Sequence, residues 1–359
     1  MAILFTGFPG FLGSELLPRV LRRKPDARAT CLVQQKFLPL AFARANALMA
    51  ADPSLRQRID VVEGDISTPG LGLPRDLSRS IDEIFHLAAI YDLSVSREAG
   101  LRVNVEGTRN VLDFAQTCAS LTRLHYVSTC YVSGRFDGLF RESDLAKGQA
   151  FNNFYEETKY LAEVEVQRRM QAGMPVTIYR PAVVVGDSVT GATQKFDGPY
   201  VVVQWLLRQP AVAFLPVVGN PHAYRFNVVP SDFIVEAIDH LSSMSGSRGK
   251  VYQLADPSPL TVSETIDLMA RASNRRVIRI PLTRGLAKGA IDYLPGVYRL
   301  MRIPSAAVDY FVHPTTYDTS NSRTDLAGSG IAAPPLQSYV GAMVAFARSH
   351  PEIGSSAMA

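Results

Sequence analysis

The chain has 359 residues, of which 47% are hydrophobic and 19% are charged, and its formal net charge at pH 7 is +4. This composition excludes a disordered chain, and basic residues that form no run longer than three disfavour nucleic acid as the main partner. No stretch reaches the ~18 uninterrupted apolar residues of a membrane span, so we expect no transmembrane segment.

The first predicted strand, Ala2–Phe5, runs directly into a turn with three glycines. Gly7 permits a tight turn, Gly10 lets backbone amides approach a pyrophosphate, and Gly13 permits close packing of helix against strand. The predicted helix Phe11–Arg23 adds the positive end of its dipole to this turn. The turn therefore predicts a dinucleotide site built from Thr6, Gly7, Phe8, Pro9, Gly10, Phe11, Leu12 and Gly13.

Apolar runs of strand length alternate with helical patterns through the first half of the chain. Further strands are predicted at Ala29–Val33, Ile59–Glu63, Glu83–Leu87, Arg123–Ser128 and Val176–Tyr179. A second helix is predicted over Gly107–Ala119, with apolar residues along one face. This alternation predicts an α/β fold with a doubly wound parallel sheet.

A tyrosine and a lysine four positions apart form the second informative motif. Tyr155 and Lys159 lie in a segment with strong helix formers, so they share one helix face. We expect the Lys159 ammonium to lower the pKa of the Tyr155 phenol, which would then transfer protons near neutral pH. The preceding strand ends in two hydroxyls, Ser128 and Thr129, either of which could hold a carbonyl oxygen beside Tyr155.

The second half of the chain has a looser pattern. Residues 186–199 read as a loop, Ile234–Leu241 and Val262–Ala272 as helices, and Val251–Leu254 as a late strand. The apolar residues 200–218 favour a buried helix followed by a loop, with a surface that takes lipophilic substrate from a bilayer as the alternative. Residues 275–312 are basic and apolar, and favour a solvated helix face, with an arginine-bearing lid as the alternative.

Taken together, these motifs resemble the extended short-chain dehydrogenase/reductase family, closest to its fatty acyl reductase and thioester reductase branch. The matching pieces are Thr6–Gly13, Gly64–Ile66, His86–Ala89, Asn104–Thr108, Val127–Thr129, Tyr155–Lys159 and Arg180–Pro181, in family order. The resemblance implies a Rossmann domain over residues 1–185, to which part of residues 220–256 returns, and a smaller, mainly substrate-binding region over residues 186–359.

The resemblance also assigns roles to single residues. It implies that Thr129 and Tyr155 bind the carbonyl oxygen, that Tyr155 supplies the proton and that Lys159 also holds the nicotinamide ribose, with Ser128 as a further catalytic candidate. Other cofactor contacts that it implies are Asp65 and Ile66 at the adenine, Ala88 and Ala89 in the cleft, Asn104, and Pro181 and Val183 behind the nicotinamide.

The end of the second predicted strand bears on the choice of cofactor. An acidic residue there would bind the ribose 2′-hydroxyl of NAD, and none is present. Gln34 and Lys36 are compatible with a 2′-phosphate, although the thioester reductases have an arginine where this chain has Gln34. We therefore expect NADP(H) rather than NAD(H).

These patterns predict an NADPH-dependent reductase of a lipophilic acyl thioester or fatty aldehyde, with substrate possible on coenzyme A or on a separate carrier protein. A ketone or hydroxysteroid-type alcohol dehydrogenase and a nucleotide-sugar epimerase or dehydratase stay open as alternatives. Three cysteines without metal spacing, six scattered histidines and no signal peptide predict a cytoplasmic protein without a metal site. The resemblance favours a homodimer.

Overall fold

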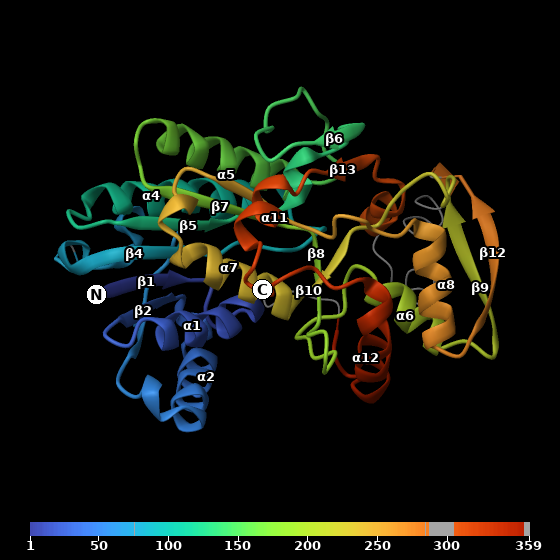
Figure 1. Ribbon diagram of the computed structural model, residues 1–359, viewed down its shortest axis with the longest axis horizontal. Helices are drawn as coiled ribbons and strands as arrows, with labels where there is room; N and C mark the ends of the chain where they lie inside the picture. The colour runs from blue at the N-terminus through green and yellow to red at the C-terminus, as the bar shows by residue number, and fades with distance from the viewer. Residues whose placement is uncertain (75, 284, 287–304, 355–359) are drawn as a thin grey trace.

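A seven-stranded parallel sheet forms the centre of the computed structural model, which describes residues 1–74, 76–283, 285–286 and 305–354 (Figure 1). Its strands, in spatial order, are β3 (Ile59–Glu63), β2 (Arg28–Val33), β1 (Ala2–Thr6), β4 (Ile81–His86), β5 (Arg123–Val127), β7 (Val176–Pro181) and β11 (Val251–Leu254). Strand order reverses between β1 and β4, and ligands of such sheets bind at this switch point, beyond the carboxyl ends of the strands. The predicted doubly wound α/β fold is confirmed.

Helices cover both faces of the sheet, because residues of each strand point alternately to the two sides. In β1, Ile3 and Phe5 belong to one buried cluster and Leu4 to the other. The first face is covered by α1 (Phe11–Arg23), α2 (Leu38–Ala51) and α7 (Ser231–Ser243). The second face is covered by α4 (Gly107–Thr117) and α5 (Phe154–Gln171) (Figure 1).

Besides the two clusters on the faces of the sheet, a further apolar cluster lies beyond the carboxyl ends of the strands. It is built mainly from the second half of the chain, and we call it the second apolar cluster. It contains α6 (Tyr200–Leu207), α8 (Val262–Ala272) and α12 (Leu336–Ser349), the strand pair β8 (Val183–Val185) with β10 (Val228–Pro230), and the strand pair β9 (Val212–Val218) with β12 (Arg276–Leu282). The chain crosses back to the sheet at β11 and again at α11 (Ser320–Leu326), which contacts β11 and α7. The short strands β6 (Gly138–Phe140) and β13 (Thr315–Tyr317) pair beside it, and α3 (Arg97–Gly100) precedes a π-helical turn at Leu101–Glu106.

Two predictions for the second half of the chain are wrong. Residues 212–218, expected as loop, form strand β9, and the basic segment begins as strand β12 rather than as a helix. The two strands pair in parallel over seven residues each. Neither strand can be predicted from its own sequence, because each is stabilised by a partner far along the chain. Four of the seven basic residues on which the lid alternative depends, Arg284, Lys288, Arg299 and Arg302, lie outside the described residues.

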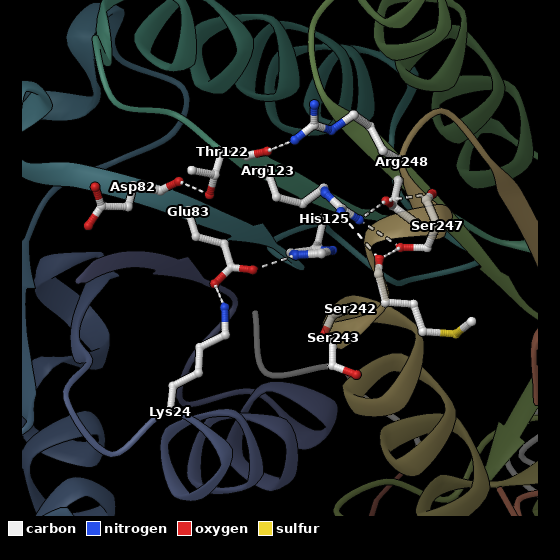
Figure 2. A network of polar contacts seen from close by, with 12 residues as sticks. Lys24, Asp82, Glu83, Thr122, Arg123, His125, Ser242, Ser243, Ser247 and Arg248 are labelled. Atoms are coloured by element: carbon white, nitrogen blue, oxygen red, sulfur yellow. Dashed lines mark hydrogen bonds and ion pairs between the residues drawn. The ribbon is translucent and has the colours of Figure 1, made fainter.

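A buried polar network lies at the amino ends of the strands (Figure 2). The glycine turn lies at the opposite, carboxyl ends. Glu83 lies between Lys24, with which it pairs, and His125, whose Nε2 is 2.8 Å from the carboxylate. Burial raises the pKa of Glu83, but the hydrogen bonds and charges of His125 and Lys24 outweigh it and lower the pKa to about 2. Arg123 extends the network by donating to the hydroxyls of Thr177 and Ser247. The network ties β4, β5 and β7 together at the end remote from the site.

Candidate active site

Helix α5 carries the predicted tyrosine and lysine on its buried side. The side chain of Asn153 caps the helix by accepting a hydrogen bond from the backbone N–H of Glu156, at 3.0 Å. Acidic residues occupy the first turn and arginines the last, which complements the helix dipole. The cap and these charges fix where α5 begins, and so place Tyr155 next to the end of β5.

The structure brings Tyr155 and Thr129 together. Thr129 follows β5, and its hydroxyl lies close enough to the phenol of Tyr155 to lower the pKa of that phenol. The same threonine contacts the backbone oxygen of Pro181, at 3.4 Å, and accepts from the N–H of Tyr131, at 3.3 Å. Two hydroxyls thus meet at the carboxyl edge of the sheet, which is the arrangement that a carbonyl oxygen would require there.

Lys159 does not act on Tyr155 in the way that the sequence suggested. Its ammonium donates to the hydroxyl of Tyr126, at 3.1 Å, and to the backbone oxygen of Val127, at 2.9 Å. Burial raises the pKa of Tyr155, and the neighbouring hydroxyl of Thr129 opposes this only in part. The prediction of a lowered Tyr155 pKa is therefore wrong, because the desolvation of the phenol outweighs every favourable interaction. Burial also lowers the pKa of Lys159 itself, to about 8.

Ser128 faces a different part of the molecule from Thr129. Its hydroxyl donates to a carboxylate oxygen of Glu163, at 2.5 Å. Glu163 also receives two nitrogens of Arg180, at 2.6 and 3.0 Å, and both side chains of this ion pair are fully buried. Successive residues of an extended segment alternate in direction, which explains why Ser128 joins this ion pair while Thr129 meets Tyr155.

A cluster that the sequence analysis missed adjoins Tyr155. The ring of Tyr91 meets the ring of Tyr155 edge to face, with centroids 5.1 Å apart. The Tyr91 hydroxyl donates to Asp197, and Asp197 pairs with Lys195 at 3.0 Å. Lys195 also donates to the backbone oxygen of Tyr91, at 3.2 Å. The loop of residues 186–199 is thereby fixed against Tyr155, a contact for which the local sequence holds no signal.

The glycine turn has the geometry of an anion cradle. Gly7 has a φ of +92°, and a Cβ at this position would lie 2.8 Å from backbone atoms of Leu87 and Ala88. A Cβ on Gly13 would lie 2.4 Å from the backbone oxygen of Gly7. Helix α1 begins at Phe11 with no side-chain cap and no acidic residue in its first turn. Its first N–H groups and its dipole are thus available to a phosphate group, and the turn fits a dinucleotide.

The predicted adenosine end of this site contains charges of both signs. Gln34 donates to a carboxylate oxygen of Asp65, at 2.9 Å, so two predicted cofactor residues bind one another. Lys36 lies over the ring of Phe37, 4.8 Å from its centroid. Arg44, on α2, reaches the glycine turn, where it donates to the backbone oxygen of Pro9 and to the hydroxyl of Ser14. A guanidinium beside the turn is compatible with a phosphate-bearing cofactor.

Several other predicted cofactor residues hold the strand ends. The hydroxyl of Thr6 lies 2.8 Å from Nδ1 of His86 and accepts from the N–H of Ala88, at 3.2 Å. Asn104 hydrogen-bonds the backbone of Ile90 and the hydroxyl of Thr158, and so joins the loop after β4 to α5.

Four further predicted cofactor residues follow or end strands of the structure. Ile66 is buried after β3, Ala89 is exposed after β4, Pro181 ends β7 and Val183 begins β8. All four stand near the carboxyl ends of strands, where the predicted cleft lies.

A small cavity borders Tyr131, which belongs to the second apolar cluster. Its described lining residues are Tyr131, Arg225, Asn227, Pro259, His313, Thr315, Thr316 and Tyr317. Burial lowers the pKa of His313 to about 4, so its imidazole is neutral at pH 7, and Nδ1 has no hydrogen-bond partner. Among the described residues, no group of histidine, cysteine or carboxylate side chains could hold a metal ion. No helix within the described ranges is long and apolar enough to cross a membrane.

Comparison with known proteins adds independent findings. The NAD-binding family model described as Male sterility protein matches residues 5–238. A linear gramicidin synthase of Brevibacillus parabrevis is 30% identical over 289 residues, which are 76% of this chain and 5% of that protein. Fatty acyl-CoA reductase wat of Drosophila melanogaster is 27% identical over 277 residues, which are 66% of this chain and 53% of that protein. The chain therefore spans about half of one relative and a small part of the other.

Solved structures show the same fold. The terminal R domain from the myxalamid PKS-NRPS biosynthetic pathway has a TM-score of 0.82 at 28% identity, over 98% of this chain and 91% of that chain. UDP-glucuronic acid 4-epimerase from Bacillus cereus, in complex with NAD, has a TM-score of 0.68 over 100% of this chain and 99% of that chain. At 18% identity, the second likeness concerns the fold alone.

Proposed function

Because the chain belongs to the NAD-binding family described as Male sterility protein, and is an NAD(P)-dependent oxidoreductase of the extended short-chain dehydrogenase/reductase type, we propose that it uses NADPH to reduce a lipophilic acyl thioester or fatty aldehyde. The observation that carries this proposal is the close approach of the Thr129 and Tyr155 hydroxyls, with Lys159 buried beside them, at the carboxyl ends of the strands, where the glycine turn also lies.

The proposed chemistry uses the two hydroxyls of this pair. Bound nicotinamide supplies a hydride to the carbonyl carbon. Thr129 and Tyr155 hydrogen-bond the carbonyl oxygen as negative charge develops on it, and Tyr155 then donates its phenolic proton to that oxygen. Because burial raises its pKa, Tyr155 is protonated at neutral pH, which is the state that reduction requires. Lys159 holds the end of β5 through Val127 and Tyr126, and keeps a positive charge beneath the site.

A thioester adds one step to this scheme. Hydride addition and protonation give a hemithioacetal, whose collapse breaks the carbon–sulfur bond and releases a thiol and an aldehyde. The aldehyde would present its carbonyl oxygen to the same pair of hydroxyls, where a second hydride from the cofactor would give the alcohol. Support for a lipophilic acyl substrate comes from the second apolar cluster, which contains Tyr131, and from the fatty acyl-CoA reductase relative.

NADPH is proposed over NADH on the charges at the adenosine end. No acidic residue ends β2, and Lys36 and Arg44 bring two cations to the turn and to the strand end. Gln34 is held by Asp65, so we assign the 2′-phosphate to the two cations rather than to the amide.

The proposal extends to a homodimer that forms through α4 and α5. Phe154 and Val164 are exposed on the outer surface of α5.

Replacement of Tyr155 by phenylalanine tests the assignment. Tyr155→Phe removes the proton donor and should lower turnover by about 100-fold or more, while NADPH binding, followed by cofactor fluorescence, stays unchanged. Tyr160→Phe is the matched control, since it makes the same change on the same helix away from Thr129. The substrate panel contains an acyl-CoA, a fatty aldehyde, a ketone and a UDP-sugar. Turnover of the ketone alone would favour an alcohol dehydrogenase, and sugar interconversion without net NADPH oxidation an epimerase. Unchanged turnover in Tyr155→Phe would refute the catalytic assignment.

A further inference from the structure

The strand pair β9–β12 has one apolar face that nothing in the described structure covers. The pair stands at the end of the molecule farthest from the N-terminus, with α8 beside its inner face (Figure 1). Its outer face exposes Val212 by 41%, Phe214 by 50%, Ile278 by 46% and Ile280 by 42%. We call these four residues the outer apolar face.

The outer apolar face follows from the alternation of side chains in the two strands. In β9, Ala213, Leu215 and Val217 point inward and are buried, while Val212 and Phe214 point outward. The pairing places Phe214 opposite Ile278, so the exposed side chains of the two strands form one continuous surface.

The chain segments that form this face contain no acidic residue. Residues 198–231 and 273–283 contain no aspartate or glutamate, and their arginines are Arg208, Arg225, Arg275, Arg276 and Arg279. Arg276 lies opposite Val212 and is exposed beside the outer apolar face. Arg279 points to the inner side, where it pairs with Asp267 of α8 at 2.6 Å. The outward side chains are therefore aliphatic, aromatic or cationic.

The free edge of β9 does not accept another strand at its centre. The side chain of Gln209 hydrogen-bonds both the N–H and the backbone oxygen of Phe214, at 2.8 and 3.1 Å, and Trp205 donates to the same oxygen. An added strand would have to displace these bonds. The partner must therefore meet the face of the pair rather than this edge.

We propose that the outer apolar face rests on an anionic lipid surface. Apolar tips with flanking cations are the composition of protein segments that lie in a membrane interface. Specific protein interfaces carry about one hydrogen bond per 100–200 Å², and this face offers few groups to make them. A second copy of the chain would bring the same cations toward one another. The contact is independent of the substrate proposed above.

Vesicle flotation tests the contact with the full chain. The vesicles are pure phosphatidylcholine, or equal parts phosphatidylcholine and phosphatidylglycerol. We expect flotation with the mixed vesicles and not with the neutral ones, and a loss in high salt, which screens the arginines. Phe214→Ser combined with Ile278→Ser should lower the partition coefficient about tenfold. Arg276→Gln should lower it about fivefold.

The matched control is Leu139→Ser combined with Phe42→Ser, on β6 and α2, which removes exposed apolar side chains elsewhere and should float as the wild type does. Circular dichroism verifies that each variant folds. Absence of flotation with anionic vesicles, or equal flotation of the Phe214/Ile278 variant, would overturn the proposal. A dimer in light scattering that this variant converts to a monomer would instead assign the face to a second copy. Binding of an acidic carrier protein without flotation would assign it to a protein.

Discussion

The buried ammonium of Lys159 makes a quantitative prediction for the pH dependence of catalysis. Burial lowers its pKa to about 8, whereas the pKa of Tyr155 is raised by burial. Between pH 7 and 9.5 the tyrosine therefore stays protonated and only the lysine changes charge. The protonated fraction of Lys159 falls from about nine-tenths at pH 7 to about one-tenth at pH 9.

If the charge of Lys159 is needed, kcat/KM for the reduced carbonyl falls about tenfold between pH 7 and pH 9, with a slope of one logarithmic unit per pH unit above about 8. The assay is the initial rate of NADPH oxidation at low substrate and saturating cofactor. Unfolding caused by the titration of Lys159 cannot account for this fall in kcat/KM. A lysine whose pKa is lower in the folded state than its unfolded value of about 10.4 adds stability as the pH rises between the two values.

Lys159→Arg separates this explanation from others, since a guanidinium stays charged throughout the range. In that variant the alkaline fall should disappear, at whatever level of activity the larger side chain permits. A wild-type profile that is flat to pH 9.5, or a Lys159→Arg profile with the same break near pH 8, would refute the assignment of the titration to Lys159.

Two further predictions concern the framework of the site. Glu163→Gln leaves the guanidinium of Arg180 buried without its counter-charge and should cost about 3–5 kcal/mol of stability, seen as a lower urea midpoint. Glu165→Gln, on the solvent side of the same helix, should cost less than about 1 kcal/mol, and equal effects of the two would contradict the argument. Gly13→Ala places a Cβ 2.4 Å from a backbone oxygen of the glycine turn and should abolish NADPH binding. Gly341→Ala, which meets open space within helix α12, should keep that binding, and retained binding in Gly13→Ala would count against the turn as the dinucleotide site.

The parts of the fold that the sequence predicted well are those fixed by local patterns. The helix from Phe11 to Arg23 and the strand Ile59–Glu63 have the predicted bounds, since a glycine turn and short apolar runs mark their ends. The strand pair β9–β12 was missed because its partners are about sixty residues apart and one of them was assigned to a helix. A parallel pair needs both strands, and the local signal in either one is also compatible with loop or helix.

The same distinction between local patterns and long-range contacts applies to the predictions for the site. Spacing alone predicts that Tyr155 and Lys159 share a helix face, and the structure has both on the buried side of α5. Spacing does not tell which partners the two side chains meet, because Tyr126 and Val127 reach Lys159 from a strand, and Tyr91 and Asp197 come from two distant loops. These contacts depend on how the second half of the chain folds back over the first.

Burial is the largest cause of the shifted pKa values of Tyr155 and Lys159, and it acts on acids and bases in opposite directions. It raises the pKa of Tyr155 and lowers that of Lys159, so at neutral pH the phenol keeps its proton more firmly than a free tyrosine would. In the proposed reaction this would not prevent proton donation, because hydride addition would turn the carbonyl oxygen into an alkoxide, which is a stronger base than a phenolate. A tyrosine that stays protonated until that moment donates when charge appears on the substrate. The reverse reaction would need a tyrosine that has already lost its proton, a state that the same burial disfavours near neutral pH.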